Sequence, residues 1–316
     1  MIRHPYTVFH VAAEVHANVR GMIIKESYVH NDDMLVVWCE GERAGYDIEV
    51  HLKEPIVAMV GREHRGRPRH HTRDVFPLLR GEVIRKVYQP VEDRCVHIVT
   101  NRQTVIVQLY SGGRANVICA NAESVVVDAL KNRQRMFGSE TLSISLRPPA
   151  RTNTQRTVQW VLCFEHLHGS KEYAAEICFR CGISEDMMWH DLSTDDKNRL
   201  INEAQAFRND VQQRPVPSIL RSVKGDTIFS LMPLHGYTVV NSDTAISNHP
   251  LTLNAQRATT QTYPSVCDTL NSVIRMRVRE RAYHELYRSC EHSIDREIRR
   301  LERACMELHE YVSTKE

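Results

Sequence analysis

The segment at residues 20–25 reads RGMIIK, and the segment at residues 80–85 reads RGEVIR, so the pattern returns after 60 positions. The same shift relates Tyr28 to Tyr88 and Asp33 to Asp93. Amphipathic segments precede both copies, FHVAAEVHANV in the first and DVFPLL in the second. This repetition indicates that the first half of the chain consists of two similar units.

Both copies continue with short runs of alternating or β-branched apolar residues. The first copy contains MLVVWC and YDIEVHL, and the second contains CVHIVT and TVIVQLY. These runs predict strands, and glycines at 41, 45, 112 and 113 predict the turns between them. Because each open sheet must bury an apolar face, the two copies together predict a pseudo-repeated β-sandwich.

A basic segment joins the two copies. Residues 61–73 read GREHRGRPRHHTR and include Arg65, Arg67 and Arg69. Two interpretations remain open, a solvated connector and a loop that contacts phosphate groups. The composition of the whole chain is equally ambiguous. Only 8 of the 41 basic residues are lysine, and either a GC-rich genome or phosphate recognition explains this excess of arginine.

A helical part follows the repeat. Residues 145–157 are rich in proline and polar residues and predict a linker. Helical periodicity begins after them, with Gly182 as a predicted C-cap and Ser193 as a predicted N-cap. RPVPS at 214–218 ends this part. Short strands and a polar loop up to Pro264 are expected after it.

The end of the chain is predicted to be one helix. From about Ser265 the apolar residues fall into a heptad seam of Ile294, Ile298, Leu301, Cys305, Leu308 and Val312, which predicts the start of a coiled coil. We therefore predict an α+β chain with four segments: 1–150 (β domain), 158–213 (helical domain), 218–264 (returning strands and loop) and 265–316 (helix leading into a coiled coil).

The composition excludes several classes of protein. Apolar residues at 42% and charged residues at 25% are typical of a globular chain. The longest apolar run, Met34 to Cys39, is far shorter than the ~20 residues of a membrane span. No secretory signal is recognisable, so the nine cysteines predict free thiols in a reducing cytoplasm.

Catalytic and metal-binding patterns are missing or incomplete. The sequence contains no Gly-Lys dipeptide and no GxGxxG, which excludes the usual phosphate loops. HELYR at 284–288 has Arg288 where a zinc protease needs a second histidine. The pair Cys178 and Cys181 has no second pair at zinc-ribbon spacing. We therefore expect a protein that is not an enzyme and that needs no cofactor or metal.

The order of motifs along the chain resembles the N-terminal region of the NFACT family. That family includes the bacterial RqcH proteins of ribosome-associated quality control and proteins called fibronectin-binding protein A. The resemblance rests on the Asp93-Arg94 pair that opens a strand, on GGRANVI at 112–118, on KEYAAEICFRCGIS at 171–184 and on TYPSVCDTLNSVIRM at 262–276. Gln108, Leu109 and Cys267 depart from the family pattern.

The resemblance implies a fold and a function. It implies a β domain and helical insert like those of formamidopyrimidine-DNA glycosylases, followed by a coiled coil. It also implies that the chain binds tRNA, alanyl-tRNA in the bacterial members, and the large ribosomal subunit that carries peptidyl-tRNA, to support tailing of stalled chains. Asp93 and Arg94 would contact the tRNA, with Arg114 and Asn116 nearby. The exposed seam leaves self-association open.

Physical chemistry allows this role and also a plainer one. Arg94 can bind a phosphate with two hydrogen bonds, and Asp93 can accept one from a 2′-hydroxyl or a base amine. The alternative is a surface ion pair worth less than ~1 kcal/mol. The first copy has Asp33-Met34 at this place and so keeps only the aspartate, which favours a functional role for the pair over a purely structural one. Two further functions remain as alternatives, a non-catalytic relative of DNA glycosylases and a surface adhesin that binds fibronectin.

Overall fold

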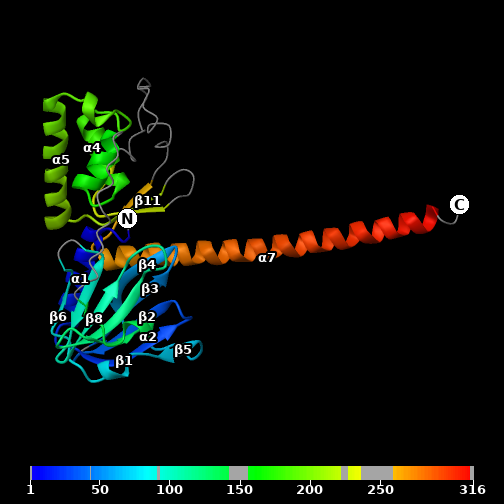
Figure 1. Cartoon of the computed structure of the whole chain (residues 1–316), viewed down its shortest axis with the longest axis horizontal. Helices are drawn as coiled ribbons and strands as arrows, with labels where there is room; N and C mark the ends of the chain where they lie inside the picture. Colours follow the sequence, from blue (N-terminus) through cyan, green and yellow to red (C-terminus); the bar gives the residue numbers. More distant parts are fainter. Residues whose placement is uncertain are drawn as a thin grey trace. The chain divides into compact units, whose positions relative to one another are not determined.

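The structure is a computed structural model of the whole chain. It describes residues 2–42, 44–90, 93–141, 156–221, 227–235 and 259–313. The chain divides into two compact units, Met1–Asn271 and Ser272–Glu316 (Figure 1). The predicted linker at 145–157 lies almost wholly outside the described residues. The architecture is α+β with antiparallel sheets, as the sequence predicted.

The first copy of the repeat forms one antiparallel sheet in the order β4-β3-β2-β1-β5. Four of its strands form a meander in which each strand pairs with the next one along the chain. The fifth strand returns to pair with β1 at the far edge. The strands are β1 (Ile23–His30), β2 (Met34–Glu40), β3 (Gly45–Lys53), β4 (Ile56–Glu63) and β5 (Thr72–Asp74).

The second copy forms a similar sheet in the order β10-β9-β8-β7-β6. Its strands are β6 (Lys86–Tyr88), β7 (Cys95–Val99), β8 (Gln103–Gln108), β9 (Asn116–Asn121) and β10 (Val126–Ala129). A four-residue helical turn, α2 (Arg133–Met136), follows. Met136 packs on the apolar cluster of Ile106, Ile118 and Val126. Each copy therefore folds as its own five-stranded sheet, and the predicted repeat is visible in the topology.

The repeated RGxxI segments join the two sheets. The Gly21 amide donates to the Ile84 carbonyl at 2.8 Å, and the Gly81 amide donates to the Ile24 carbonyl at 2.8 Å. Ile24 and Ile84 donate in the same reciprocal way, to the carbonyls of Glu82 and Met22. Every one of these bonds maps onto another when 60 is added to or subtracted from the residue number, so the two copies are related by a local pseudo-twofold.

Helix α1 (Pro5–Val19) leads directly into the first copy. It contacts β3 and β4 of one sheet and β6 and β7 of the other. Its Glu14 carboxylate accepts hydrogen bonds from the amides of Val266 and Cys267, at 2.7 and 2.9 Å. Since these amides open helix α7, Glu14 caps that helix from a distant part of the chain. The second copy is preceded by the short 3₁₀ turn η1 (Pro77–Leu79) instead.

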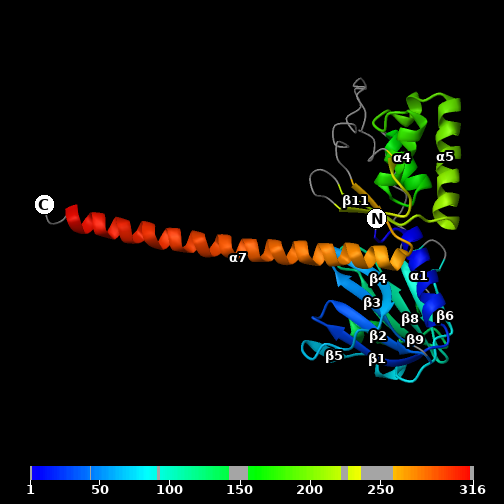
Figure 2. The ribbon, with the colours of Figure 1, turned by 180° about the vertical axis from the view of Figure 1, so that it is seen from behind.

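The helical insert begins after the predicted linker. It contains α3 (Val158–Val161), the π-helical turn η3 (Leu162–His166), α4 (Lys171–Cys181), the 3₁₀ turn η4 (Trp189–Asp191) and α5 (Thr194–Gln213). Helices α4 and α5 lie side by side in both views (Figures 1 and 2). Gly182 ends α4 with φ +63, and the Ser193 hydroxyl accepts from the Asp196 amide at the start of α5. Both predicted caps are confirmed.

A three-stranded antiparallel sheet follows, in the order β12-β11-β13. Its strands are β11 (Ser218–Arg221), β12 (Thr227–Ser230) and β13 (Thr259–Thr262). Residues 259–262 were predicted to lie in a polar loop, and that prediction was wrong. The segment reads Thr-Thr-Gln-Thr, which has no apolar alternation, and it becomes a strand because β11 offers it a free edge. The predicted YTVV strand at 237–240 lies outside the described residues.

The second unit is formed by helix α7 (Val266–Ser313) from Ser272 onward. The helix predicted from Ser265 is therefore confirmed. Ile294, Ile298 and Leu301 of the heptad seam are 60%, 48% and 55% exposed, so they have no second helix against them within the described part of the chain. The coiled-coil pairing of this seam stays a prediction. No helix among the described residues has the length and apolar character that crossing a bilayer requires.

The pseudo-twofold depends on two backbone conformations that favour glycine. Gly21 and Gly81 have φ +83 and +86. Since an alanine there meets no clash, its cost comes from φ alone. We expect Gly21→Ala and Gly81→Ala each to lower the free energy of unfolding by about 1–2 kcal/mol, measured by urea denaturation. Gly21→Asn is the matched control, because asparagine tolerates positive φ. Equal losses for alanine and asparagine would contradict this explanation.

Candidate functional site

The predicted pair Asp93-Arg94 lies immediately before strand β7. The Asp93 carboxylate accepts the Arg94 backbone amide at 2.6 Å, and the Tyr110 hydroxyl lies 3.1 and 3.0 Å from its two oxygens. The Arg94 carbonyl accepts the Leu109 amide at 2.8 Å. Asp93 is therefore held by the chain around it, and its carboxylate is directed at the backbone.

The Arg94 guanidinium is half-buried, and no acceptor lies against it among the described residues. It makes no ion pair and no side-chain hydrogen bond with any residue that the structure describes. The guanidinium lies close to the helical insert, because a Cβ added to Gly169 would lie 3.7 Å from Arg94 Nη2. Burial, followed by the charge of Arg3, lowers the pKa of Arg94 from its ordinary value. A partly desolvated cation that no described acceptor pairs with can bind an anion.

Two helices begin beside this guanidinium. His4 is the N-cap of α1, and Ser170 is the N-cap of α4. The His4 ring connects the two helix starts, because its Nε2 lies 2.8 Å from the Leu167 carbonyl, three residues before Ser170. The Gln89 side chain donates to the carbonyls of Pro5 and Asp93, which ties the start of α1 to the Asp93-Arg94 pair. Helix N-termini carry partial positive charge, so both add to the positive potential here.

Two further arginines contribute charge. Both lower the pKa of the Arg94 guanidinium by their own positive charge, Arg3 more than Arg114. Arg3 is paired with Glu54 at 2.5 Å. Arg114 is exposed, donates from Nε to the Ser111 carbonyl at 3.2 Å, and lies 6.0 Å from the Tyr110 ring. The predicted site residues Asp93, Arg94 and Arg114 therefore do lie in one neighbourhood.

Asn116 has a different role. Its Oδ1 accepts the amides of Val117 and Lys131, both at 2.9 Å, and its Nδ2 donates to the Lys131 carbonyl at 3.1 Å. Nδ2 also contacts Met136 Sδ at 3.4 Å. The side chain is buried and its hydrogen-bonding groups are used to hold the turn after β10 against β9. RNA contact by Asn116 stays a prediction that this geometry does not favour.

The basic segment between the copies crosses the first sheet. Strands β4 and β5 are the opposite edges of that sheet, so residues 64–71 must pass over one of its faces. Arg67 pairs with Asp74 at 2.6 Å and Glu26 at 3.4 Å, and its guanidinium lies 4.7 Å from the centre of the Tyr28 ring. Arg67 is thus neutralised within the sheet. Arg65 and Arg69 are exposed, and their phosphate contacts stay a prediction.

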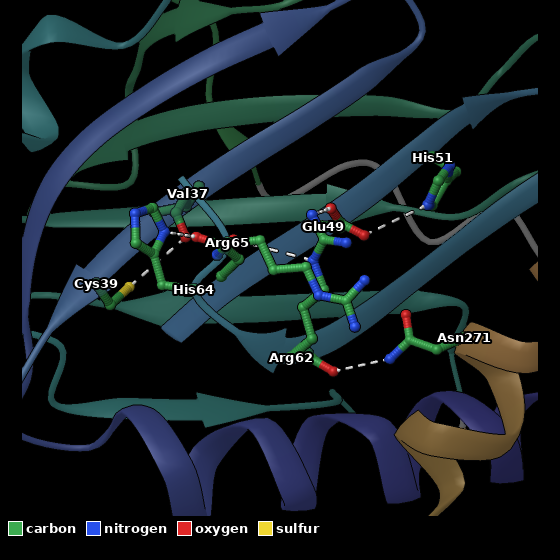
Figure 3. Close-up of polar contacts among 10 residues, drawn as sticks. Val37, Cys39, Glu49, His51, Arg62, His64, Arg65 and Asn271 are labelled. Atoms are coloured by element: carbon green, nitrogen blue, oxygen red, sulfur yellow. Dashed lines mark hydrogen bonds and ion pairs between the residues drawn. The ribbon is translucent and has the colours of Figure 1, made fainter. Parts of the chain in front are cut away.

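The same face of the sheet carries a buried polar cluster that the sequence analysis missed. Asp47 and Glu49 are 1% and 4% exposed. Arg62 Nη2 lies 2.5 Å from Glu49, and His64 Nδ1 lies 2.7 Å from Asp47 (Figure 3). Burial and Arg62 lower the pKa of His51, on the same strand face, to about 4. The alternation of Asp47, Glu49 and His51 in β3 was the signal available in the sequence.

This second cluster is explained by folding. Each buried carboxylate has a cation or a backbone amide as its partner, including the Arg65 amide on Asp47 at 3.3 Å. The segment at 62–67 supplies those partners as it crosses the sheet. Breaking such a buried pair leaves an uncompensated charge and costs about 3–5 kcal/mol. The cluster therefore attaches the basic segment to the sheet, and the Arg94 neighbourhood remains the better candidate for binding.

The His4 ring adds a pH dependence to the fold. Its Nδ1 accepts the Tyr6 amide at 3.4 Å while Nε2 faces the Leu167 carbonyl, so the neutral ring with hydrogen on Nε2 fits both contacts. Burial lowers the pKa of His4 to about 3. The unfolded chain binds this proton near pH 6.5 and the folded chain does not, so stability is present above pH 6.5 and falls as the pH drops toward 3.

We therefore expect the wild type to lose on the order of 2 kcal/mol of unfolding free energy through His4 between pH 7.5 and pH 5. The measurement is urea denaturation at both pH values for the wild type and His4→Asn. His10 and His51 titrate in both proteins, so the difference between their pH-dependent losses isolates His4. Equal losses in the two proteins would show that His4 does not contribute.

Asn116 provides a test of its structural role. Asn116→Ala removes the acceptor of the buried Val117 amide and of the partly buried Lys131 amide, so we expect the free energy of unfolding to fall by about 2 kcal/mol. Asn18→Ala is the control, because Asn18 is exposed on α1 and only donates to the Glu14 carbonyl one turn earlier. The two losses are compared by urea denaturation. An Asn116→Ala variant as stable as Asn18→Ala would refute the role.

The chain was compared with known proteins. No family model matches its sequence, and no curated protein matches it significantly. It is similar in structure to the fibrinogen-binding protein from Staphylococcus aureus, with TM-score 0.58 and 14% identity over 85% of this chain and 98% of that chain. It is also similar to the N-terminal part of the fibronectin/fibrinogen-binding protein from Streptococcus suis, with TM-score 0.54 and 16% identity over 86% of this chain and 98% of that chain.

A third structure, the N-terminal domain of the fibronectin-binding protein PavA from Streptococcus pneumoniae, has TM-score 0.41 and 16% identity over 66% of this chain and 88% of that chain. At these identities a structural likeness concerns the fold. The chain therefore shares its α+β fold with the solved S. aureus and S. suis proteins, over nearly their whole length.

Proposed function

We propose that the Arg94 neighbourhood binds a phosphate group of RNA, and that the chain is an RNA-binding protein without catalytic activity. The observation that carries this proposal is the half-buried Arg94 guanidinium, which has no acceptor among the described residues and lies beside the N-termini of α1 and α4. An RNA phosphate offers the two oxygens that a guanidinium binds best. Arg3 and Arg114 add attraction at longer range.

Asp93 makes RNA a better fit than an isolated anion. Its carboxylate acts on the guanidinium by its charge and has lone pairs left after the bonds to Arg94 N and Tyr110. A 2′-hydroxyl or a base amine one nucleotide from the bound phosphate can donate to it. A free inorganic anion would gain nothing from this carboxylate and would be repelled by it. The pair therefore suits a ligand that presents an anion and a donor together.

The finer proposal follows the NFACT resemblance. In this proposal the RNA is tRNA, alanyl-tRNA by the family resemblance, and the chain acts in the cytoplasm on the large ribosomal subunit that carries peptidyl-tRNA. The β domain and helical insert would correspond to the glycosylase-like fold, and the seam of α7 would pair in a coiled coil. Tailing of the stalled chain would be peptide transfer by the ribosome, with this chain positioning the tRNA.

A second candidate function is binding of fibrinogen or fibronectin at a cell surface. The names of the two similar structures, a fibrinogen-binding protein and a fibronectin/fibrinogen-binding protein, favour this candidate more directly than RNA binding. The geometry of this chain does not distinguish the two functions, because a guanidinium that binds a phosphate can also bind a carboxylate of an acidic protein. The two candidates therefore need an experiment that offers both ligands.

The experiment measures binding of labelled tRNA over a salt series. We expect Arg94→Gln to weaken tRNA binding about tenfold and to reduce the slope of log K against log salt by about one, as for the loss of one phosphate contact. Arg20→Gln is the matched control, since it removes the same charge from the exposed C-terminal end of α1. We expect its affinity to stay near that of the wild type.

Immobilised fibrinogen, fibronectin and abasic duplex DNA complete the design. Binding to fibrinogen or fibronectin that exceeds tRNA binding would favour the adhesin. A preference for abasic DNA that Arg94→Gln does not alter would favour a relative of DNA glycosylases. Equal tRNA affinities for Arg94→Gln and Arg20→Gln would contradict the site, whatever the affinity of the wild type.

A further inference from the structure

Tyr110 lies between two groups that flank the start of β7. Its hydroxyl is 3.0 Å from Asp93 Oδ2, 3.1 Å from Asp93 Oδ1 and 3.1 Å from Cys95 Sγ. Tyr110 lies two residues after the end of β8. Strand β8 pairs with β7, and in this pairing Gln108 lies opposite Cys95. The pairing of β7 with β8 therefore places the Tyr110 hydroxyl beside the Asp93 carboxylate.

The Asp93 carboxylate has an obvious competing partner. Its side chain is adjacent in sequence to Arg94, and its charge acts on that guanidinium, yet the two make no ion pair in the described structure. A carboxylate and a guanidinium in a partly desolvated place attract each other strongly. Something must hold the carboxylate elsewhere. Two donors do so, the Arg94 backbone amide at 2.6 Å and the Tyr110 hydroxyl.

We propose that Tyr110 is a positioning residue that holds the Asp93 carboxylate on the backbone and off the Arg94 guanidinium, so that the guanidinium stays free for a phosphate. This inference rests on the proposed RNA-binding function. It adds a residue 16 positions from Arg94 in the sequence, and it gives the hydroxyl, rather than the aromatic ring, the decisive part.

The protonation of the hydroxyl suits this task. Burial raises the pKa of Tyr110 well above its ordinary value, and the contact with Cys95 acts in the same direction. Burial also raises the pKa of Cys95 to about 12. Both groups therefore keep their hydrogens at neutral pH. The Cys95 thiol can donate to the Tyr110 oxygen, which leaves the phenolic hydrogen for Asp93.

Without the hydroxyl, the carboxylate loses one of its donors and keeps the Arg94 backbone amide and the Cys95 thiol, so it can turn toward the Arg94 guanidinium. An ion pair formed there would neutralise the guanidinium, and an incoming phosphate would first have to break it. Tyr110→Phe tests this step cleanly, because phenylalanine keeps the ring that packs at this place and removes one oxygen. Tyr88→Phe is the matched control, since it removes a half-buried hydroxyl 3.3 Å from His97 in the same sheet.

The first experiment is a double-mutant cycle on tRNA binding. We expect Tyr110→Phe to weaken binding about three- to tenfold, and Tyr88→Phe to leave it unchanged. In the Asp93→Asn background, Tyr110→Phe should have no effect on affinity, because an uncharged amide cannot neutralise Arg94. The same loss in both backgrounds would overturn the proposal, because Tyr110 would then act on the ligand or on the fold directly. The proposal would also be overturned if Tyr110→Phe did not weaken tRNA binding in the protein that keeps Asp93.

The second experiment does not depend on RNA. A crystal structure of the Tyr110→Phe variant should show an Asp93 oxygen within hydrogen-bond distance of the Arg94 guanidinium. A carboxylate that stays on the backbone amide would overturn the proposal. Failure of the proposed function itself has a different signature, because Arg94→Gln would then leave tRNA binding unchanged while the rearrangement of Asp93 in the crystal would still occur.

Discussion

The reciprocal backbone bonds between residues 21–24 and 81–84 are the constraint on which the rest of this structure depends. Gly21 and Gly81 each donate to the other copy, and the isoleucines at 24 and 84 do the same in return. Because α1 ends two residues before Gly21, this junction also determines where α1 runs. The helix then contacts both sheets, and its first turn comes to Asp93 through Gln89. The candidate site is thus a consequence of how the two copies meet.

The sequence predicted those elements of the structure that depend on interactions between residues close together in the chain. The repeat, two of the five strands in each sheet (β2, β3, β7 and β8), the caps at Gly182 and Ser193 and the long terminal helix depend on residues close to one another in the chain, and the structure contains them. Strand β13 was missed because its polar residues carry no strand pattern, and only the edge of β11 makes them a strand. The surroundings of Arg94 were equally invisible, since they include Tyr110 beside Asp93 and the backbone near Gly169, which are distant in sequence.

The arginines of this chain show why composition decided so little about function. Arg62 and Arg67 occur in the most basic segment of the sequence, yet both are paired with carboxylates of the sheet that the segment crosses. Arg94 has an aspartate directly before it and would be taken for a neutralised residue, yet it makes no ion pair with any described residue. The quantity that indicates anion binding is the number of arginines whose guanidinium has no acceptor after folding. It depends on the orientation of side chains, which a count of charges does not contain.

The repeat also separates what the fold needs from what it does not need. In the second copy, strand β7 is joined to its neighbour by the Leu109 amide on the Arg94 carbonyl. In the first copy, the Leu52 amide makes a comparable bond to the Asp33 carbonyl. Any residue can supply such a carbonyl, so the fold places no demand on the side chain. The first copy accordingly has Met34 where the second has Arg94, and it has no α4 beginning beside it. The Asp93-Arg94 pair occurs only in the copy that meets two helix N-termini, which is the place where a free guanidinium has most to offer an anion.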